Sequence, residues 1–395
     1  MALGFFILEN FTSRGVYSFH RLLKKYFSTA GSKGKEPSMF KGDLRATTIG
    51  SLPLADPREA TALVFKYASL LPAWVQLPKF PGEGMLEQYN EGLPGIKETP
   101  ERCYFDTDDP EFEQAVLSFY EGYLAVTESG SPESLEHFAI SRDRARGFFS
   151  FTDMLAEYKD RAPAIVKGQV TGPFTLATGL KDQYGKFAYY NPQLRDIIVK
   201  HISLKALWQI RMLQQFNVSV LMFLDEPSLC GFGSTAYLGV EAEDIKKDLN
   251  EAVSLIHNEK AWVGVHCCEN TDWAILLQSD IDVLNFDAYG FFDRVFLFKQ
   301  ELVAFLNRGG TLAWGIVPTH SEEVISKVTP EMLINLWKEE VQKLSSSGVA
   351  MEKIISQSLI TPSCGMGSLS AEAALKVLQL LDEVARRLRK EFNLS

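Results

Sequence analysis

The chain has 395 residues, 46% of them hydrophobic, and can bury a core the size of two or three ordinary domains or of one large barrel. Its formal net charge of -10 argues against a nucleic-acid face, and no apolar run reaches the roughly 20 residues that cross a bilayer. Five cysteines, an odd number in irregular spacing, suit a reducing cytoplasm and a metal-binding or catalytic role better than a disulfide framework.

The first forty residues differ in charge from the rest. Residues 1–41 carry seven lysines and arginines but only two acidic residues, Glu9 and Glu36. A targeting peptide has this composition, and so does an extension placed upstream of a second start at Met39. We predict a poorly ordered extension over 1–41, followed by one folded domain over 42–395.

Short apolar runs then alternate with helical patterns along the whole chain. Eight of these runs are predicted strands: 46–51, 74–77, 165–170, 218–224, 262–265, 283–286, 312–316 and 354–360. Strand-helix alternation indicates a parallel sheet, and eight such units predict an α/β fold of the (β/α)8 TIM-barrel type. An open doubly wound sheet is the alternative, and the absence of Gly-x-Gly-x-x-Gly after the first strand disfavours it.

The stretch between the second and third predicted strands, residues 79–162, is too long for a simple crossover. It contains aromatic residues and a charged run, so we predict an inserted helical segment. Cys103 falls inside it and is expected to be a buried structural cysteine, whereas the role of Cys230 stays open.

Polar residues follow almost every predicted strand. They are Gly50-Ser51, Thr171-Gly172-Pro173, Asp225-Glu226-Pro227, His266-x-Cys268, Asp287, His320 and Cys364-Gly365. In a parallel barrel the carboxyl ends of all strands meet on one rim, where active sites are built. The sequence therefore predicts a site on that rim.

Four of these residues have the chemistry of zinc ligands. His266 and Cys268 share one face of the fifth predicted strand, and Cys267 takes the other. Cys364 follows the eighth strand, which faces the fifth across the rim of a barrel, and Asp287 follows the sixth. Two thiolates, an imidazole and a carboxylate favour Zn²⁺ over harder cations. Such a site could activate a thiol substrate or a water molecule, and the residues alone leave both chemistries open.

The same motifs, in this order, resemble the cobalamin-independent methionine synthases and the wider barrel superfamily that includes uroporphyrinogen decarboxylase. The similarity covers about residues 46–387. It rests on Thr48-Ile49-Gly50-Ser51, Val170-Thr171-Gly172-Pro173, Asp225-Glu226-Pro227, His266-x-Cys268, Gly315-x-x-x-x-His320-Ser321 and Pro362-x-Cys364-Gly365.

The resemblance implies a zinc ion held by His266, Cys268, Cys364 and Asp287, the last standing where the family usually has glutamate. It also implies a homocysteine site made by Ile49, Ser51, Glu83 and Asp225, with Glu87 as a rival to Glu83. His320 is implied as a proton donor or relay beside the methyl donor. A surface histidine next to a helix cap at Ser321 is the alternative.

From these implications we expect a zinc-dependent methyltransferase that converts homocysteine to methionine. The chain has no second barrel in front of the catalytic one, so a methylated corrinoid carried by another protein is an expected donor beside a methylated folate such as 5-methyltetrahydropteroyltriglutamate. Two rivals remain: a uroporphyrinogen decarboxylase-like decarboxylase, and a non-catalytic zinc- or thiol-binding partner of a corrinoid protein.

Overall fold

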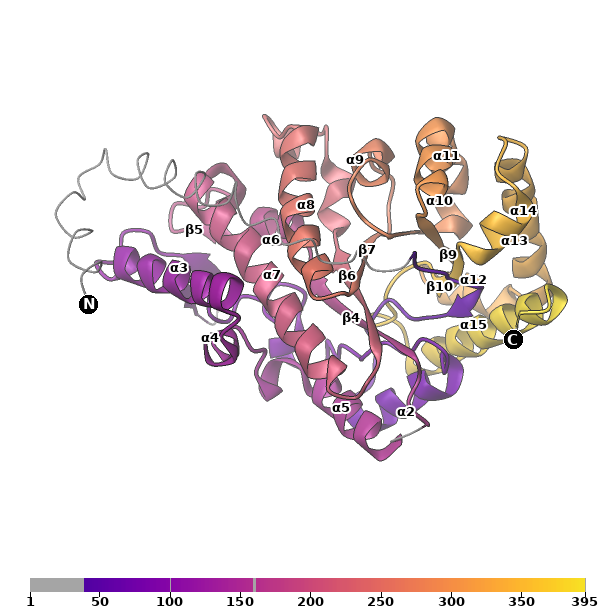
Figure 1. The fold of residues 1–395 in the computed structure, drawn as a ribbon, viewed down its shortest axis with the longest axis horizontal. Helices are drawn as coiled ribbons and strands as arrows, with labels where there is room; N and C mark the ends of the chain where they lie inside the picture. The colour runs from indigo at the N-terminus through magenta and orange to yellow at the C-terminus, as the bar shows by residue number, and fades with distance from the viewer. Residues whose placement is uncertain (1–38, 100, 159–160, 395) are drawn as a thin grey trace. The chain divides into compact units, whose positions relative to one another are not determined.

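Seven parallel strands form the central sheet of the computed structural model, in the order β1-β10-β9-β8-β7-β6-β4 (Figure 1). The structure describes residues 39–99, 101–158 and 161–394, which belong to one unit. The fold is α/β, with helices outside the sheet. The strands are β1 (Arg45–Ala46), β4 (Ile165–Thr171), β6 (Ser219–Asp225), β7 (Trp262–Cys267), β8 (Val283–Phe286), β9 (Thr311–Val317) and β10 (Ser358–Pro362).

The two edges of this sheet are joined by residues 72–77. On one side Lys167 N donates to Pro72 O at 2.9 Å, and Trp74 N donates to Lys167 O at 3.3 Å. On the other side Gln76 N donates to Gly50 O at 3.1 Å. The predicted strand at 74–77 is thus reduced to isolated parallel bridges, Ala73 with Lys167 and Ser51 with Gln76, and the sheet curls so that both edges reach it.

Side-chain amides supply hydrogen bonds where this strand ladder is incomplete. Trp74 Nε1 donates to Gln209 Oε1 at 2.8 Å, and Gln209 Nε2 donates to the Gln169 carbonyl at 3.0 Å. Gln169 Nε2 returns to the Trp74 carbonyl at 2.9 Å, and the Tyr89 hydroxyl donates to Gln169 O. These buried polar groups are therefore paired, as burial requires.

One predicted strand is wrong in its first half. We expected a strand over 354–360, but Met351–Ser356 is helix α14, and β10 begins only at Ser358. Ile354 and Ile355 are buried from a helix instead, since a short apolar run suits a buried turn of helix as well as a strand. At 46–51, regular pairing stops at Ala46.

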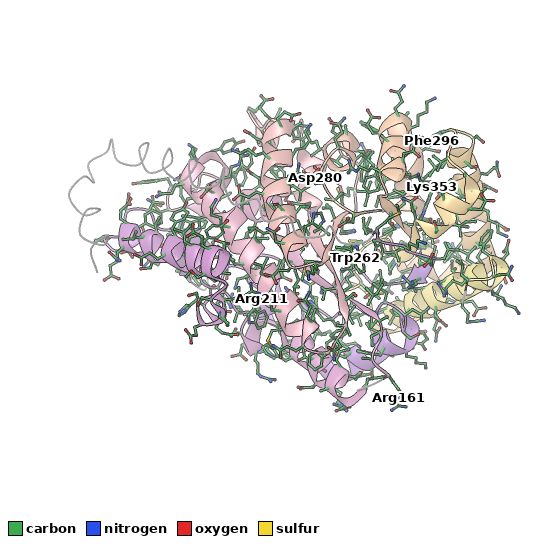
Figure 2. The ribbon with its side chains drawn as sticks, viewed as in Figure 1. Arg161, Arg211, Trp262, Asp280, Phe296 and Lys353 are labelled. Atoms are coloured by element: carbon green, nitrogen blue, oxygen red, sulfur yellow. The ribbon has the colours of Figure 1, made fainter. Side chains whose placement is uncertain are left out.

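Strand side chains alternate between two cores. Outward residues such as Val263, Val265 and Cys267 of β7 pack in the large core under the helices. Inward strand residues and two residues from outside the strands, Phe40 and Leu71, form a smaller core. The strand residues in it are Leu221, Phe223, Val283, Ala313 and Leu359. Figure 2 labels Trp262, which begins β7 near the centre of the molecule and packs against this inner core.

Phe40 places the beginning of the folded body earlier than the sequence suggested. Its side chain is 1% exposed, and its ring lies 5.1 Å from that of Trp262. Its carbonyl accepts from Thr311 Oγ1 at 3.2 Å. Phe40 therefore belongs to the inner core, although we assigned 1–41 to an extension; residues 1–38 of that prediction lie outside the described residues.

Several helices begin with a capping residue followed by proline, the pattern favoured at a helix N-terminus. Asp56, Asn191 and Thr329 accept backbone N–H bonds before Pro57, Pro192 and Pro330. No helix in the described part of the chain is both long and apolar enough to span a membrane. The helices that follow the strands are α2 (Pro57–Tyr67), α6 (Pro173–Gly179), α7 (Pro192–Gln214), α8 (Ala242–Asn258), α9 (Trp273–Leu277), α10 (Ala288–Val295), α11 (Lys299–Asn307), α12 (Glu322–Lys327), α13 (Pro330–Ser345) and α15 (Ala371–Glu391).

The long segment before β4 adds helices and a small sheet. Helices α3 and α4 cover the outer side of α7, where Phe119 and Phe138 pack beside His201. This cover explains why α7 is buried on nearly all sides. The added elements are β2 (Ile96–Glu98), β3 (Cys103–Phe105), α3 (Phe112–Ser129), α4 (Pro132–Glu136) and α5 (Arg146–Tyr158), and β5 (Lys181–Asp182) completes the small sheet.

Candidate functional site

Three metal-ligating side chains meet at the carboxyl ends of the strands. His266 lies at the end of β7, Cys268 follows that strand, and Cys364 follows β10. Their ligand atoms all lie within 4.8 Å of one another. Two thiols and an imidazole at this spacing are the donor set of a zinc site.

Asn285 fixes the orientation of the His266 ring. Its Oδ1 accepts from His266 Nδ1, and its Nδ2 donates to the Ala313 carbonyl and to Thr361 Oγ1, each at 2.8 Å. Because Nδ1 carries the proton, Nε2 holds the lone pair. Nε2 is buried without a hydrogen-bond partner among the described residues, as a metal-ligating nitrogen would be before its ion binds.

The two thiols are unequal. The hydrogen bond from Cys268 to Cys364, together with burial, raises the pKa of Cys268 well above its usual value. The same bond lowers the pKa of Cys364. Burial lowers the pKa of His266, but its contact with Cys268 and the charge of Asp225 outweigh this and raise it overall. Of the two thiols, Cys364 therefore loses its proton more readily, and the thiolate is the form that binds metal.

Ser51 is joined to the turn that carries Cys364. Ser51 Oγ accepts from Gly367 N at 3.1 Å, and Ser51 O accepts from Met366 N at 3.0 Å. A Cβ on Gly365 would lie 2.3 Å from Ser51 Oγ, so only glycine permits this approach. The Cys364-Gly365 pair thus brings a thiol and the predicted substrate-binding serine together.

Asp225 ends β6 directly beside His266, its partner in the register of β6 and β7. It is 5% exposed, and its Oδ1 has no hydrogen-bond partner within the described residues. Burial raises the pKa of this carboxyl, while the charges of Lys167 and His266 oppose the rise. A buried, unpaired carboxylate is suited to an ammonium group on a ligand.

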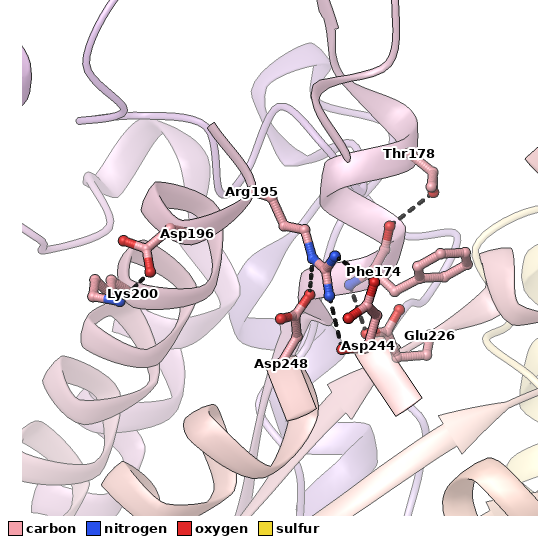
Figure 3. A network of polar contacts seen from close by, with 8 residues as sticks. All are labelled: Phe174, Thr178, Arg195, Asp196, Lys200, Glu226, Asp244 and Asp248. Carbon is pink, nitrogen blue, oxygen red and sulfur yellow. Dashed lines mark hydrogen bonds and ion pairs between the residues drawn. The ribbon is translucent and has the colours of Figure 1, made fainter. Parts of the chain in front are cut away.

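Glu226, the next residue, has a different role. Its carboxylate accepts from Phe174 N at 2.9 Å and from Thr175 N and Oγ1 at 2.8 and 2.7 Å, so it caps the N-terminus of α6. Figure 3 shows Glu226 beside Phe174, in a view that also contains the Arg195 ion pairs with Asp244 and Asp248. Burial raises the pKa of Glu226 to about 7.

Gly172 explains why that cap needs the Thr171-Gly172-Pro173 motif. A Cβ at Gly172 would lie 2.2 Å from the Glu226 carboxyl carbon. Thr171 Oγ1 in turn donates to the Met85 carbonyl at 2.6 Å, which ties the segment after Gly84 to the end of β4.

The two early glutamates are placed differently. Glu83 is buried; its Oε2 accepts from Leu77 N at 3.0 Å and its Oε1 from Arg146 N at 3.0 Å. Its carboxylate thus holds the 77–83 loop against α5. Glu87 is exposed and its carboxylate folds back over Gly84. The role of either residue in substrate binding stays a prediction.

Asp287 and His320 lie next to the three-ligand group but outside it. Asp287 Oδ1 accepts from Gly290 N at 2.8 Å and caps α10, and burial raises the pKa of this carboxyl. His320 is exposed, with its ring 6.0 Å from that of Tyr289. Ser321 beside it caps α12, as expected. Ligation by Asp287 and proton transfer by His320 stay predictions.

Sequence reasoning missed Asn285, Glu226 and Lys167 as parts of the site. Each had a signal in the sequence. Asn285 and Lys167 are polar residues inside apolar strands, and Glu226 lies in the Asp225-Glu226-Pro227 motif. Cys267 packs in the large core and donates to the Glu269 carbonyl at 3.4 Å, on the face predicted for it.

Together, a curled parallel sheet and a thiol-imidazole group at its carboxyl ends are typical of an α/β enzyme, and this group could hold a soft metal ion. A family model described as the catalytic domain of cobalamin-independent synthases matches residues 142–387, more than half of the chain. The chain therefore belongs to the cobalamin-independent methionine synthase family and is a methyltransferase.

Among solved structures, a B12-independent methionine synthase from Shewanella sp. W3-18-1 in complex with selenomethionine is similar, with a TM-score of 0.47 and 14% identity. The match covers 89% of this chain and 99% of that one. No curated protein matches the chain.

Proposed function

We propose that the chain transfers a methyl group to the sulfur of homocysteine, giving methionine, at a zinc site formed by His266, Cys268 and Cys364. The meeting of these three side chains within 4.8 Å carries the proposal. Zinc, when bound there, lowers the pKa of a thiol and so supplies a thiolate near neutral pH. Asp287 is the proposed fourth ligand, and using it requires its carboxylate to turn from the α10 cap.

The surrounding residues are proposed to hold the amino-acid part of the substrate. Asp225 takes the ammonium group, because it is buried and its Oδ1 has no hydrogen-bond partner among the described residues. Ser51, which is bonded to the turn that carries Cys364, lies near the carboxylate of the substrate. Holding the substrate in this way aligns its sulfur with the methyl donor. With a methylated folate as donor, the carbon–sulfur bond would form as the methyl carbon–nitrogen bond breaks. The donor nitrogen keeps the electron pair and takes up a proton, for which the exposed His320 is the proposed relay.

We propose a methylated folate as the donor, because the family is cobalamin-independent. The methylated corrinoid that we also expected from the sequence is thereby the less favoured donor. The same family membership removes support from the decarboxylase and from the non-catalytic binding protein.

We further propose that the sheet closes as a (β/α)8 barrel. Residues 72–77 would supply the strand that is missing between β1 and β4, and residues 79–162 would be inserted after that strand. The hydrogen bonds of this segment to both Gly50 and Lys167 support the closure. The catalytic barrel would then occupy the body of the chain after the N-terminal extension.

The test is methionine formation by purified, zinc-loaded protein with homocysteine, comparing 5-methyltetrahydropteroyltriglutamate with methylcobalamin. We expect product from the folate alone, abolished in Cys364→Ser and retained in the matched control Cys103→Ser. Product from methylcobalamin alone would overturn the donor assignment. Absence of product from both donors, with zinc bound, would overturn the proposed reaction.

A further inference from the structure

Lys167 is a fully buried lysine directly beneath the proposed site. It lies in the middle of β4, points into the sheet interior and is 0% exposed. Its Nζ donates to the Ile49 carbonyl at 2.5 Å and to Gln169 Oε1 at 3.1 Å, and lies 4.5 Å from the centre of the Phe223 ring. Burial of an ammonium group costs free energy, and these contacts offset part of that cost. We therefore asked what Lys167 does for the site.

The bond to Ile49 fixes the orientation of one peptide group. A trans peptide directs its N–H opposite to its carbonyl, so the Ile49 carbonyl held by Lys167 turns the Gly50 N–H the other way, out of the inner core. The next two carbonyls also accept hydrogen bonds, Gly50 O from Gln76 N and Ser51 O from Met366 N. Neither the Gly50 nor the Ser51 N–H donates a hydrogen bond within the described residues.

We propose that Lys167 is a positioning residue that orients the Ile49–Gly50 peptide so that the Gly50 N–H binds the carboxylate of the thiol substrate. The inference rests on the proposed function, because it takes the substrate to be an amino acid held by Asp225 and Ser51. Gly50 suits the role: a Cβ there would lie 2.5 Å from Gln76 Oε1, so the backbone is held close to its supporting strand.

The Lys167 charge acts on Asp225 as well. Burial lowers the pKa of Lys167 to about 8, and the charge of Asp225 opposes this fall. The charges of these two buried groups thus act in opposite directions to the effect of burial on each of them.

The experiment compares two thiols that differ only in the carboxylate. L-homocysteine has it, whereas 3-mercaptopropylamine has the same thiol and amine without it. Dissociation constants of both are measured by calorimetry on the zinc-loaded full chain, as wild type, Lys167→Met and Lys205→Met. Lys205 is a matched control, a second buried lysine whose Nζ donates to the Phe138 and Ala139 carbonyls, away from the site.

We expect Lys167→Met to weaken homocysteine binding by about tenfold, the effect of one well-placed hydrogen bond to a charged group, and to change 3-mercaptopropylamine binding less than about twofold. Lys205→Met should leave both unchanged. Equal weakening of both thiols, or of neither, would overturn the positioning role. A wild-type chain that binds neither thiol would instead refute the proposed function. Should Lys167→Met not fold, Lys167→Leu, which also has no donor for the Ile49 carbonyl, gives the same comparison.

Discussion

At the scale of single residues, the site depends on polar side chains that hold other side chains in place. Asn285 is the clearest case, because its three hydrogen bonds leave His266 only one orientation. Such outer contacts control both the proton position and the basicity of a metal-ligating imidazole. If the three side chains bind a metal, its affinity would therefore depend partly on Asn285, a residue outside the group of ligands.

We expect Asn285→Ala to weaken zinc binding by about 10- to 100-fold, because His266 Nδ1 loses its acceptor and the ring can rotate. Zinc affinity is measured by competition with a chromogenic chelator. Asn335→Ala, on the exposed side of α13, serves as the control. Unchanged zinc affinity in Asn285→Ala would show that the ring is held by its packing alone.

Lys205 shows the opposite situation, a buried charge without a carboxylate in contact. Burial lowers the pKa of Lys205 to about 7, with a small opposing effect of Glu91 and a further lowering by Arg144. The unfolded chain keeps the ordinary value of 10.5, so between pH 7 and 10.5 it binds one proton more than the folded chain. This residue therefore makes the folded state more stable as the pH rises through that window.

Urea unfolding at pH 7 and pH 10 tests this effect. Between pH 7 and pH 10 the free energy of unfolding of wild type should rise by up to about 4 kcal/mol relative to that of Lys205→Met. The variant should be the more stable protein at pH 7. Parallel pH dependence in the two proteins would mean that Lys205 stays protonated when buried.

At the scale of elements, one carboxylate joins the ends of two strands to a helix. Glu226 leaves β6 and caps α6, which follows β4, and Gly172 makes room for it. Gly172 has φ of -69°, which any residue can adopt, so its requirement comes from this packing and not from its backbone angle. The cap thus fixes the rim next to Asp225.

A double-mutant cycle measures that contact. Gly172→Ala in the wild-type background should lower the free energy of unfolding by about 1–3 kcal/mol, because the new methyl group collides with the Glu226 carboxylate. Glu226→Ala should cost about 2 kcal/mol by leaving the first amides of α6 unpaired. In the Glu226→Ala background Gly172→Ala should become nearly neutral by urea unfolding; full additivity would contradict the proposed collision.

At the scale of the whole molecule, the interior of the curled sheet is divided into an apolar floor and a polar upper layer. The floor is the small core around Phe40 and Trp262, and the upper layer holds Lys167, Asp225 and His266. The floor closes the amino-terminal end of the sheet with a residue from before β1. Stability and site geometry are therefore supported from the same interior.

Phe40→Ala tests the floor. We expect a loss of about 3–5 kcal/mol in the free energy of unfolding, typical of a buried phenylalanine, because the small core has few other large side chains. Met39→Ala, at a position 58% exposed, should be nearly neutral in the same urea titration. A small effect of Phe40→Ala would place the beginning of the folded body after residue 41, as the sequence suggested.

The sequence by itself determined the α/β pattern, most strand positions and which three side chains, His266, Cys268 and Cys364, lie together at the site. It could do so because short apolar runs between helical patterns, and the polar residues that follow almost every run, are local signals. It did not decide the helix at 351–356, since a short apolar run fits either element. Nor did it assign the cap made by Glu226, whose partners lie about fifty residues away in the chain.

Only the tertiary structure showed which polar residues meet at the candidate metal site and which ones hydrogen-bond to the surrounding backbone and side chains instead. His266, Cys268 and Cys364 meet because parallel strands align their carboxyl ends, whereas Asp287 caps its own helix. Lys167 reaches Ile49 across 118 positions of sequence, and Asn285 reaches Thr361 across 76. Contacts of this range arise only when the sheet curls, because the curl brings inward side chains from distant strands into one small space.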